Sequence, residues 1–218
     1  MKSTKLFLSL MILMTIQVSC MEEYVDLGLP SGTLWATCNV GADNPEDYGD
    51  YFAWGETTTK TFYEWATYKY VSDDNHKLTK YCDRKEDGYR GFSDKLTSLE
   101  RSDDAASVNW SSRWCMPTEK QFRELKEKCV WKWTKRNGKE GYEVSSPNGN
   151  SIFLPAAGYK GPDGFLAYDG FEGRYWSSSL VTYSSFQGGC FEFSSGSLDF
   201  YSLRDRCFGF QVRPVRSK

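Results

Sequence analysis

The sequence contains a single histidine, His76, among 218 residues. One histidine excludes metal sites built from several imidazoles, and it leaves a Ser-His-Asp triad with only one candidate base. Basic and acidic residues nearly balance, at 27 and 29, so the chain lacks the basic excess that attracts nucleic acid. We therefore expect no nucleic-acid partner, and we interpret His76, which lies in a charged segment, as a surface residue.

Long hydrophobic runs are also missing, apart from one near the start of the chain. The run from Leu6 to Ile16 is apolar except for Ser9 and Thr15, and two lysines precede it. It is shorter than the roughly 20 residues that a membrane-spanning helix needs. A positive start, a short apolar run and small residues after it are typical of a secretory signal, so we expect residues 1–19 to be a signal peptide.

Cys20 directly follows the small residue Ser19 at the end of this signal. The arrangement resembles the lipobox of bacterial lipoproteins, which implies lipidation of Cys20 and a short tether over residues 20–23. The residues after the cysteine, Met21 to Glu23, resemble the acidic tag of Bacteroidetes-type lipoproteins that are moved to the cell surface. These resemblances imply an exported outer-membrane lipoprotein, exposed at the cell surface and attached to the membrane through a lipid anchor only. The alternative is ordinary secretion, in which Cys20 has no such role.

The remaining cysteines lack the short CxxC spacing of zinc ribbons and redox motifs. An exported protein is permitted disulfides, but six cysteines allow about 15 complete pairings and the sequence does not choose among them. Buried free thiols are the alternative for several of them. The six are Cys38, Cys82, Cys115, Cys129, Cys190 and Cys207.

Aromatic residues are abundant, at 17% of the chain. A chain this rich in rings is expected to fold and to leave some rings partly exposed. Neither a fixed-period repeat nor a low-complexity tract interrupts it, so we expect one domain over residues 24–216.

The clearest predicted helix lies at about residues 118–129. Thr118 and Gln121 have the spacing of a capping box, and Phe122, Leu125 and Cys129 form one apolar stripe. Short strands are predicted around it, with turn signals at Asn137-Gly138, Asn148-Gly149 and Ser195-Gly196. One main helix among many short antiparallel strands and hairpins predicts an α+β domain. The core candidates are Trp114, Phe122, Leu125 and Trp176.

Several stretches resemble the Fibrobacter succinogenes major paralogous domain. They are spread from residue 24 to residue 215, and they include Tyr24-Val-Asp-Leu-Gly-Leu29, Leu34-Trp-Ala-Thr-Cys-Asn-Val-Gly-Ala42, Tyr48-Gly-Asp-Tyr-Phe-Ala-Trp-Gly-Glu56, Trp114-Cys-Met-Pro-Thr-Glu119, Asn150-Ser-Ile-Phe-Leu-Pro-Ala-Ala-Gly-Tyr159, Tyr175-Trp-Ser-Ser-Ser179 and Val212-Arg-Pro-Val215. The resemblance implies a C-type lectin-like fold, related to formylglycine-generating enzymes and to the variable proteins of diversity-generating retroelements. The latter carry their diversified residues in C-terminal hairpins.

A binding surface is predicted on the C-terminal hairpins, at about residues 180–210. Apolar residues alternate there with a mixed set, and a strand framework that keeps one face constant leaves the other face free to bind. The alternative for any one residue is a plain solvent-exposed sheet face. The predicted ligand-binding residues are Tyr183, Glu192, Ser194, Asp199, Tyr201, Leu203, Asp205 and Phe210.

No metal or other cofactor is expected. Sugar-binding lectins that use calcium carry Glu-Pro-Asn or Gln-Pro-Asp, whereas the nearest strings here, Ser146-Pro-Asn148 and Gly161-Pro-Asp163, lack the first ligand and indicate turns. Two adjacent aspartates, Asp73 and Asp74, are weak evidence for calcium.

Catalysis is not expected either. Formylglycine-generating enzymes use two closely spaced cysteines, but Cys190 and Cys207 are 17 residues apart and lack a motif that would lower a thiol pKa. The sequence therefore predicts a non-catalytic cell-surface lipoprotein that binds a protein or glycan ligand. The alternatives are a structural or adhesin module of a surface assembly and, less favoured, a formylglycine-generating-type thiol oxidase.

Overall fold

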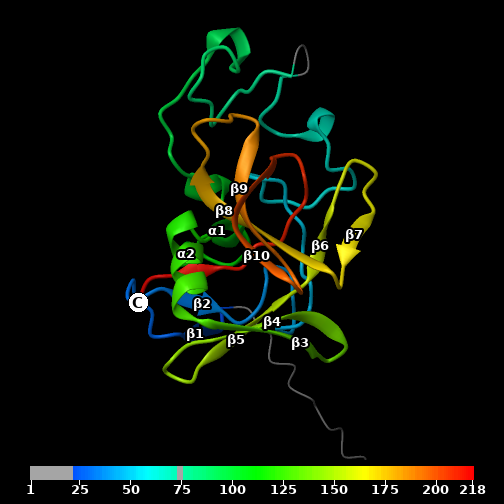
Figure 1. Cartoon of the computed structure of the whole chain (residues 1–218). Helices are drawn as coiled ribbons and strands as arrows, with labels where there is room; N and C mark the ends of the chain where they lie inside the picture. Colours follow the sequence, from blue (N-terminus) through cyan, green and yellow to red (C-terminus); the bar gives the residue numbers. More distant parts are fainter. Residues whose placement is uncertain (1–21, 73–75) are drawn as a thin grey trace, which may run out of the picture.

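The computed structural model describes residues 22–72 and 76–218 (Figure 1). The predicted signal peptide, the lipidation candidate Cys20, and Asp73 and Asp74 lie outside the described residues. The strands are β1 (Tyr24–Asp26), β2 (Leu34–Ala36), β3 (Val130–Arg136), β4 (Lys139–Ser145), β5 (Ser151–Pro155), β6 (Ala157–Lys160), β7 (Leu166–Asp169), β8 (Glu172–Leu180), β9 (Gln187–Ser194), β10 (Ser197–Asp205) and β11 (Val215–Arg216). The helices are α1 (Ala105–Asn109) and α2 (Glu119–Lys128), with 3-10 turns η1 (Trp65–Thr67), η2 (Tyr89–Gly91) and η3 (Arg101–Asp103). This content confirms the α+β class. None of the helices in the described ranges is long and apolar enough to cross a bilayer.

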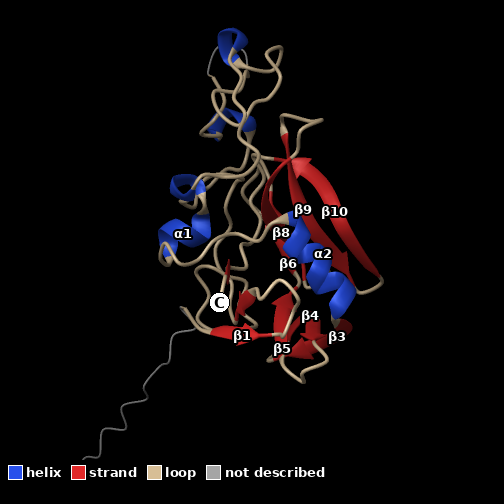
Figure 2. Cartoon of the chain, turned by 90° about the vertical axis from the view of Figure 1, so that its left-hand side faces the viewer, coloured by secondary structure: helices blue, strands red, loops and turns tan. Residues whose placement is uncertain are grey.

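The strands of the described part form three sheets. The largest has the order β10-β9-β8-β6-β7, so β10 and β7 are its edge strands. A second sheet, β1-β2-β11, joins the two ends of the domain, and β3-β4-β5 is a meander. Figure 1 shows the β6–β7 hairpin extending to one side of the molecule, and Figure 2 shows α2 lying across β8, β9 and β10.

Helix α2 begins where the capping box predicts. The Thr118 hydroxyl accepts a hydrogen bond from the Gln121 amide (3.3 Å), and the Gln121 side chain accepts one from the Thr118 amide (2.8 Å). These bonds satisfy donors at the helix start that would otherwise lack partners. Phe122 and Leu125 are buried, as expected, and the Phe122 ring stacks on Phe191 of β9 at 5.3 Å.

Strands β8 and β9 lie between two hydrophobic cores. Tyr175, Phe191 and Phe193 point into the core beneath α2, which also contains Trp35, Phe122 and Leu125. The intervening residues Trp176 and Cys190 point into the other core, which also contains Trp54, Trp114 and Phe210. Because alternate side chains of a strand point to opposite faces, both faces of this part of the sheet are buried. All four predicted core residues are buried.

A buried arginine holds the ends of the domain together. Arg213 donates hydrogen bonds to the Asn39 side chain (2.8 Å), to the Ala36 carbonyl (3.0 Å) and to the Phe153 carbonyl (2.9 Å). It is fully buried. The segment before β11 is not a continuous strand, because it makes single bridges to three different segments.

The irregular segment between residues 57 and 100 is organised by Asp103 of η3. Its carboxylate accepts hydrogen bonds from Lys69 (3.1 Å), Lys80 (2.6 Å) and the Tyr81 hydroxyl (2.8 Å). Burial opposes ionisation of this carboxyl, but these hydrogen bonds, led by that of Lys80, hold the pKa of Asp103 well below its ordinary value. The hydrogen bonds of the Asp103 carboxylate therefore connect parts of a segment that has little regular secondary structure.

Candidate functional site

The predicted C-terminal patch is divided by a β-bulge in β10. Asp199 pairs with Glu192, and Ser202 pairs with Cys190, so β10 contains one more residue than β9 between these pairs. Residues 190 and 192 share a face of β9, so Asp199 shares a face with Ser202. Leu203 is then on the opposite face. The expectation that Asp199 and Leu203 lie on one surface is wrong, because the extra residue reverses the alternation.

Glu192 is not an open surface residue. It is buried, and its carboxylate forms ion pairs with Arg174 (3.2 Å) and Arg204 (2.7 Å). Arg174 also pairs with Glu172 (2.7 Å). Two arginines and two carboxylates neutralise one another in this cluster, so Glu192 holds strands together rather than facing a ligand.

Phe210 is also wrongly placed by the sequence pattern. Its side chain is 0% exposed, and its ring stacks on the Trp176 indole. The pattern fails because the segment around Phe210 does not continue the C-terminal hairpin. Phe210 pairs with Phe52 in an isolated bridge, and its side chain belongs to the core. Cys207 is buried as well.

The other predicted residues occupy different parts of the strands. Tyr201 is half-buried, with its ring against Gly189, where a side chain in place of the glycine hydrogen would collide with it. Burial and then the nearby Glu119 and Tyr183 raise the pKa of Tyr201 to about 12. Tyr183 is 67% exposed.

The remaining members do not form one patch with these tyrosines. Leu203 and Asp205 are half-buried further along β10, and Ser194 lies at the far end of β9, where its hydroxyl is 3.0 Å from that of Ser197. Of the predicted set, only Tyr183 combines a large ring with high exposure.

The cysteines of the alternative thiol-oxidase prediction are buried free thiols. Burial raises the pKa of Cys190, and it raises the pKa of Cys207 to about 12. Cys82, Cys115 and Cys129 are also free. A raised pKa disfavours the thiolate that nucleophilic or redox chemistry requires.

Within residues 22–72 and 76–218, no group of three or more His, Cys, Asp or Glu side chains is placed to hold a metal ion. Ser146-Pro-Asn148 and Gly161-Pro-Asp163 form turns, as predicted.

A different surface brings exposed aromatic side chains together. We define the hairpin aromatic surface as Phe62, Phe165, Leu166 and Tyr168, which are 49%, 75%, 37% and 55% exposed. Phe165 follows the turn that links β6 to β7, and the Asp163 carboxylate fixes that turn by accepting a hydrogen bond from the Phe165 amide (3.0 Å). Large apolar side chains that are exposed together mark interaction surfaces.

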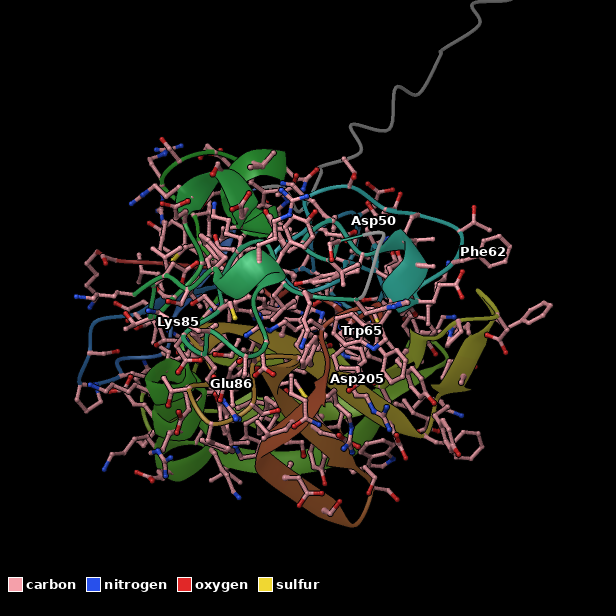
Figure 3. All side chains as sticks on the ribbon, turned by 90° about the horizontal axis from the view of Figure 1, so that it is seen from above. Asp50, Phe62, Trp65, Lys85, Glu86 and Asp205 are labelled. Atoms are coloured by element: carbon pink, nitrogen blue, oxygen red, sulfur yellow. The ribbon has the colours of Figure 1, made fainter. Side chains whose placement is uncertain are left out.

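Phe62 comes from a distant part of the sequence and reaches the same hairpin. The Tyr63 amide donates to the Gly161 carbonyl (3.3 Å), and a Cβ added at Gly164 would collide with the Thr61 carbonyl and lie 3.7 Å from the Phe62 ring. Figure 3 shows the Phe62 ring at the periphery of the molecule, directed away from the ribbon. The loop that carries Phe62 therefore packs against the turn of the β6–β7 hairpin.

Tyr168 is held in a strained backbone conformation. Its φ of 59° is in the left-handed region, which tyrosine rarely adopts and which costs about 1 kcal/mol or more. Its ring stacks on Tyr159 at 6.0 Å, and the Arg174 guanidinium lies 4.1 Å from the Tyr159 ring centre. The exposed Tyr168 ring therefore packs on Tyr159, and Tyr159 in turn packs against Arg174. Strain retained at an exposed aromatic residue is typical of a functional site.

The sequence contained a signal for this surface. Phe165, Leu166 and Tyr168 lie between the turn signals Asp163-Gly164 and Asp169-Gly170, and this pattern indicates a short hairpin with large apolar side chains. The sequence does not indicate that Phe62 lies nearby, because its position depends on the path of an irregular loop.

Comparison with protein-family models finds no match, and comparisons with curated proteins and with solved structures find none either. The resemblance to the Fibrobacter succinogenes major paralogous domain therefore remains a prediction based on the sequence motifs.

Proposed function

We propose that this chain is an exported outer-membrane lipoprotein that binds a protein ligand at the cell surface without chemistry, through the hairpin aromatic surface. The observation that carries the proposal is the grouping of four exposed apolar side chains on an edge hairpin and its neighbouring loop. Aromatic residues are enriched in the buried centres of protein interfaces, where rigid rings give large contact area at low entropic cost.

The chemistry of this surface favours a protein over a glycan. Phe62, Phe165 and Leu166 offer no hydrogen-bonding side-chain group, whereas sugar recognition needs polar groups that meet the ring hydroxyls. Trp35, Trp54 and Trp176 are fully buried and offer no stacking face to a sugar ring. A glycan ligand is therefore the competing outcome of the test below.

We further propose that the domain has a C-type lectin-like fold. The support is the α+β content, the helix at the predicted capping box, and the motif resemblance spread along residues 24–215. The structural or adhesin alternative shares this fold and the same exposed surface. The thiol-oxidase alternative is disfavoured by the buried, high-pKa thiols of Cys190 and Cys207.

The anchor is proposed from the apolar run that ends at Cys20. In the full chain, Cys20→Ala is expected to move the protein from the membrane fraction to the soluble fraction, and a diacyl or triacyl mass is expected on the Cys20 peptide of the unchanged protein. Recovery of a wild-type N-terminal peptide that carries Cys20 without lipid would contradict the anchor.

Ligand binding is testable with the chain from residue 21 onward, which contains every described strand and helix. Binding to a panel of extracellular proteins and to a glycan array is compared for wild type, Phe165→Ser and Tyr183→Ser. The proposal predicts a protein ligand whose binding is lost in Phe165→Ser and kept in Tyr183→Ser, the matched change at an exposed ring elsewhere. Binding only to glycans, or loss only in Tyr183→Ser, would contradict it.

A further inference from the structure

A cleft of about 750 Å³ lies near the two ends of the domain. We call it the arginine cleft, because Arg101, Arg113 and Arg216 line it together with Lys218. Figure 2 shows the C-terminus between α1 and β1, and residues of β1 and of the C-terminal segment line the cleft. Four cationic side chains face a single lining carboxylate, that of Asp26.

Two of the four cations have acidic partners. Lys218 pairs with Asp26 (2.7 Å), and Arg113 pairs with Glu22 (2.6 Å). Within the described residues, Arg101 and Arg216 make no ion pair; Arg101 donates instead to the Ser112 carbonyl. Arg101 does act electrostatically on the buried Asp104 carboxyl, so Arg216 is the lining arginine for which the described residues supply no acidic partner.

The Arg216 guanidinium is oriented by aromatic rings. It lies 4.0 Å from the centre of the Tyr24 ring and 5.2 Å from that of Trp114. Stacking fixes the plane of a guanidinium and leaves the donors at its edge available for an anion. The Nε of Arg216 is buried and has no hydrogen-bond partner among the described residues.

Trp114 supplies an independent observation. Its side chain is fully buried and lines the cleft, yet its indole Nε1 has no partner among the described residues. A buried donor without an acceptor is destabilising, so a ligand oxygen that accepts from it recovers that free energy. The residues that line the cleft thus include the Arg216 guanidinium and two buried N–H donors without partners, Arg216 Nε and Trp114 Nε1.

We infer that the arginine cleft binds a phosphate monoester. Guanidinium groups match the oxygens of a phosphate with paired hydrogen bonds, and the three arginines and one lysine that line the cleft supply positive charge for the monoester. The phosphate belongs either to a soluble metabolite or to a lipid headgroup. Its site is separate from the hairpin aromatic surface, so either can fail without the other.

The test uses the chain from residue 21 onward and glycerol 3-phosphate as the probe. Binding is followed by calorimetry and by the NMR signal of the Trp114 indole N–H. We expect saturable binding with a shift of that signal, weakened about tenfold or more by Arg216→Gln and by Arg101→Gln. Arg90→Gln is the matched control, because Arg90 is an exposed arginine stacked on Tyr89 at 5.0 Å in η2, far from the C-terminus in Figure 1.

Vesicles distinguish the two sources of phosphate. Binding to phosphatidylcholine vesicles that contain phosphatidic acid, but not to phosphatidylcholine alone, indicates a headgroup, provided that glycerol 3-phosphate competes. Binding of glycerol 3-phosphate alone indicates a soluble ligand. Absence of saturable binding to either, or an equal loss in Arg90→Gln, would overturn the inference. Phe165→Ser is expected to bind the phosphate normally, which separates this result from the proposed function.

Discussion

The Phe210 ring stacks on the Trp176 indole, with centroids 4.1 Å apart and planes inclined by 22°. Trp176 also donates from its Nε1 to the Phe52 carbonyl (2.8 Å). This contact joins the large sheet to the irregular segment that precedes β11. Because of this contact, Phe210 belongs to the core and not to the predicted binding surface.

Phe210→Ala is expected to destabilise the domain by about 3–5 kcal/mol, the usual cost of removing a buried phenylalanine ring. Phe165→Ala is the matched control, because it removes the same ring from an exposed position, and it is expected to change stability by less than about 0.5 kcal/mol. Urea denaturation measures both. Equal effects of the two changes would contradict the burial of Phe210.

Stability is expected to fall in acid because of Asp103. The folded-state pKa of Asp103 lies below its ordinary value of 3.8, so its contribution is fully present above about pH 4. That contribution is lost as the pH falls from this value towards the folded-state pKa. Asp103→Asn should lower the free energy of unfolding at pH 7 by about 2 kcal/mol, because charged hydrogen bonds are lost.

Denaturation curves at pH 7, 4 and 3 test this prediction. The difference between wild type and Asp103→Asn should shrink as the pH falls. Asp199→Asn, an exposed aspartate on β10, is the control and should leave stability nearly unchanged. A wild-type to Asp103→Asn difference that stays constant from pH 7 to pH 3 would be the contrary result.

The buried thiols are expected to resist modification. At pH 8, Cys190 and Cys207 should react with iodoacetamide more than about 100-fold more slowly in the folded protein than in urea, because a raised pKa leaves little thiolate and burial limits access. Peptide mass spectrometry measures the labelling of each cysteine. Rapid labelling of Cys190 or Cys207 in the folded protein would reopen the thiol-oxidase alternative.

Tyr168→Gly separates stability from binding. Glycine adopts the left-handed conformation without strain, which offsets the lost stacking on Tyr159, so stability should change by less than about 1 kcal/mol. Ligand binding should be lost with the ring. Thermal unfolding and a binding assay are measured on the same sample, and retained binding would show that the ring of Tyr168 is not part of the site.

Local signals in the sequence predicted local structure well. The capping box at Thr118 and Gln121 predicted the start of α2, and Asn137-Gly138 predicted the hairpin between β3 and β4, because both depend on neighbouring residues alone. The burial of Trp114 and Trp176 also followed from residue type.

The predicted site failed where distant contacts decide the outcome. A single extra residue in β10 separates Asp199 from Leu203, and no local pattern marks that bulge. Cys190 and Glu192 lie on a face of β9 that is buried, because the core that contains Trp176 covers it. Alternation alone predicts that this face is exposed. The meeting of Phe62 with the β6–β7 hairpin depends on the path of an irregular loop.

Photo-crosslinking on intact cells tests the proposed recognition surface most directly. A benzoylphenylalanine residue replaces Phe165 in one full-length variant and Tyr183, the exposed aromatic residue of the sequence-predicted set, in another. The hairpin aromatic surface predicts a discrete protein adduct from position 165 and none from position 183. An adduct from position 183 alone, or from neither position, would contradict it.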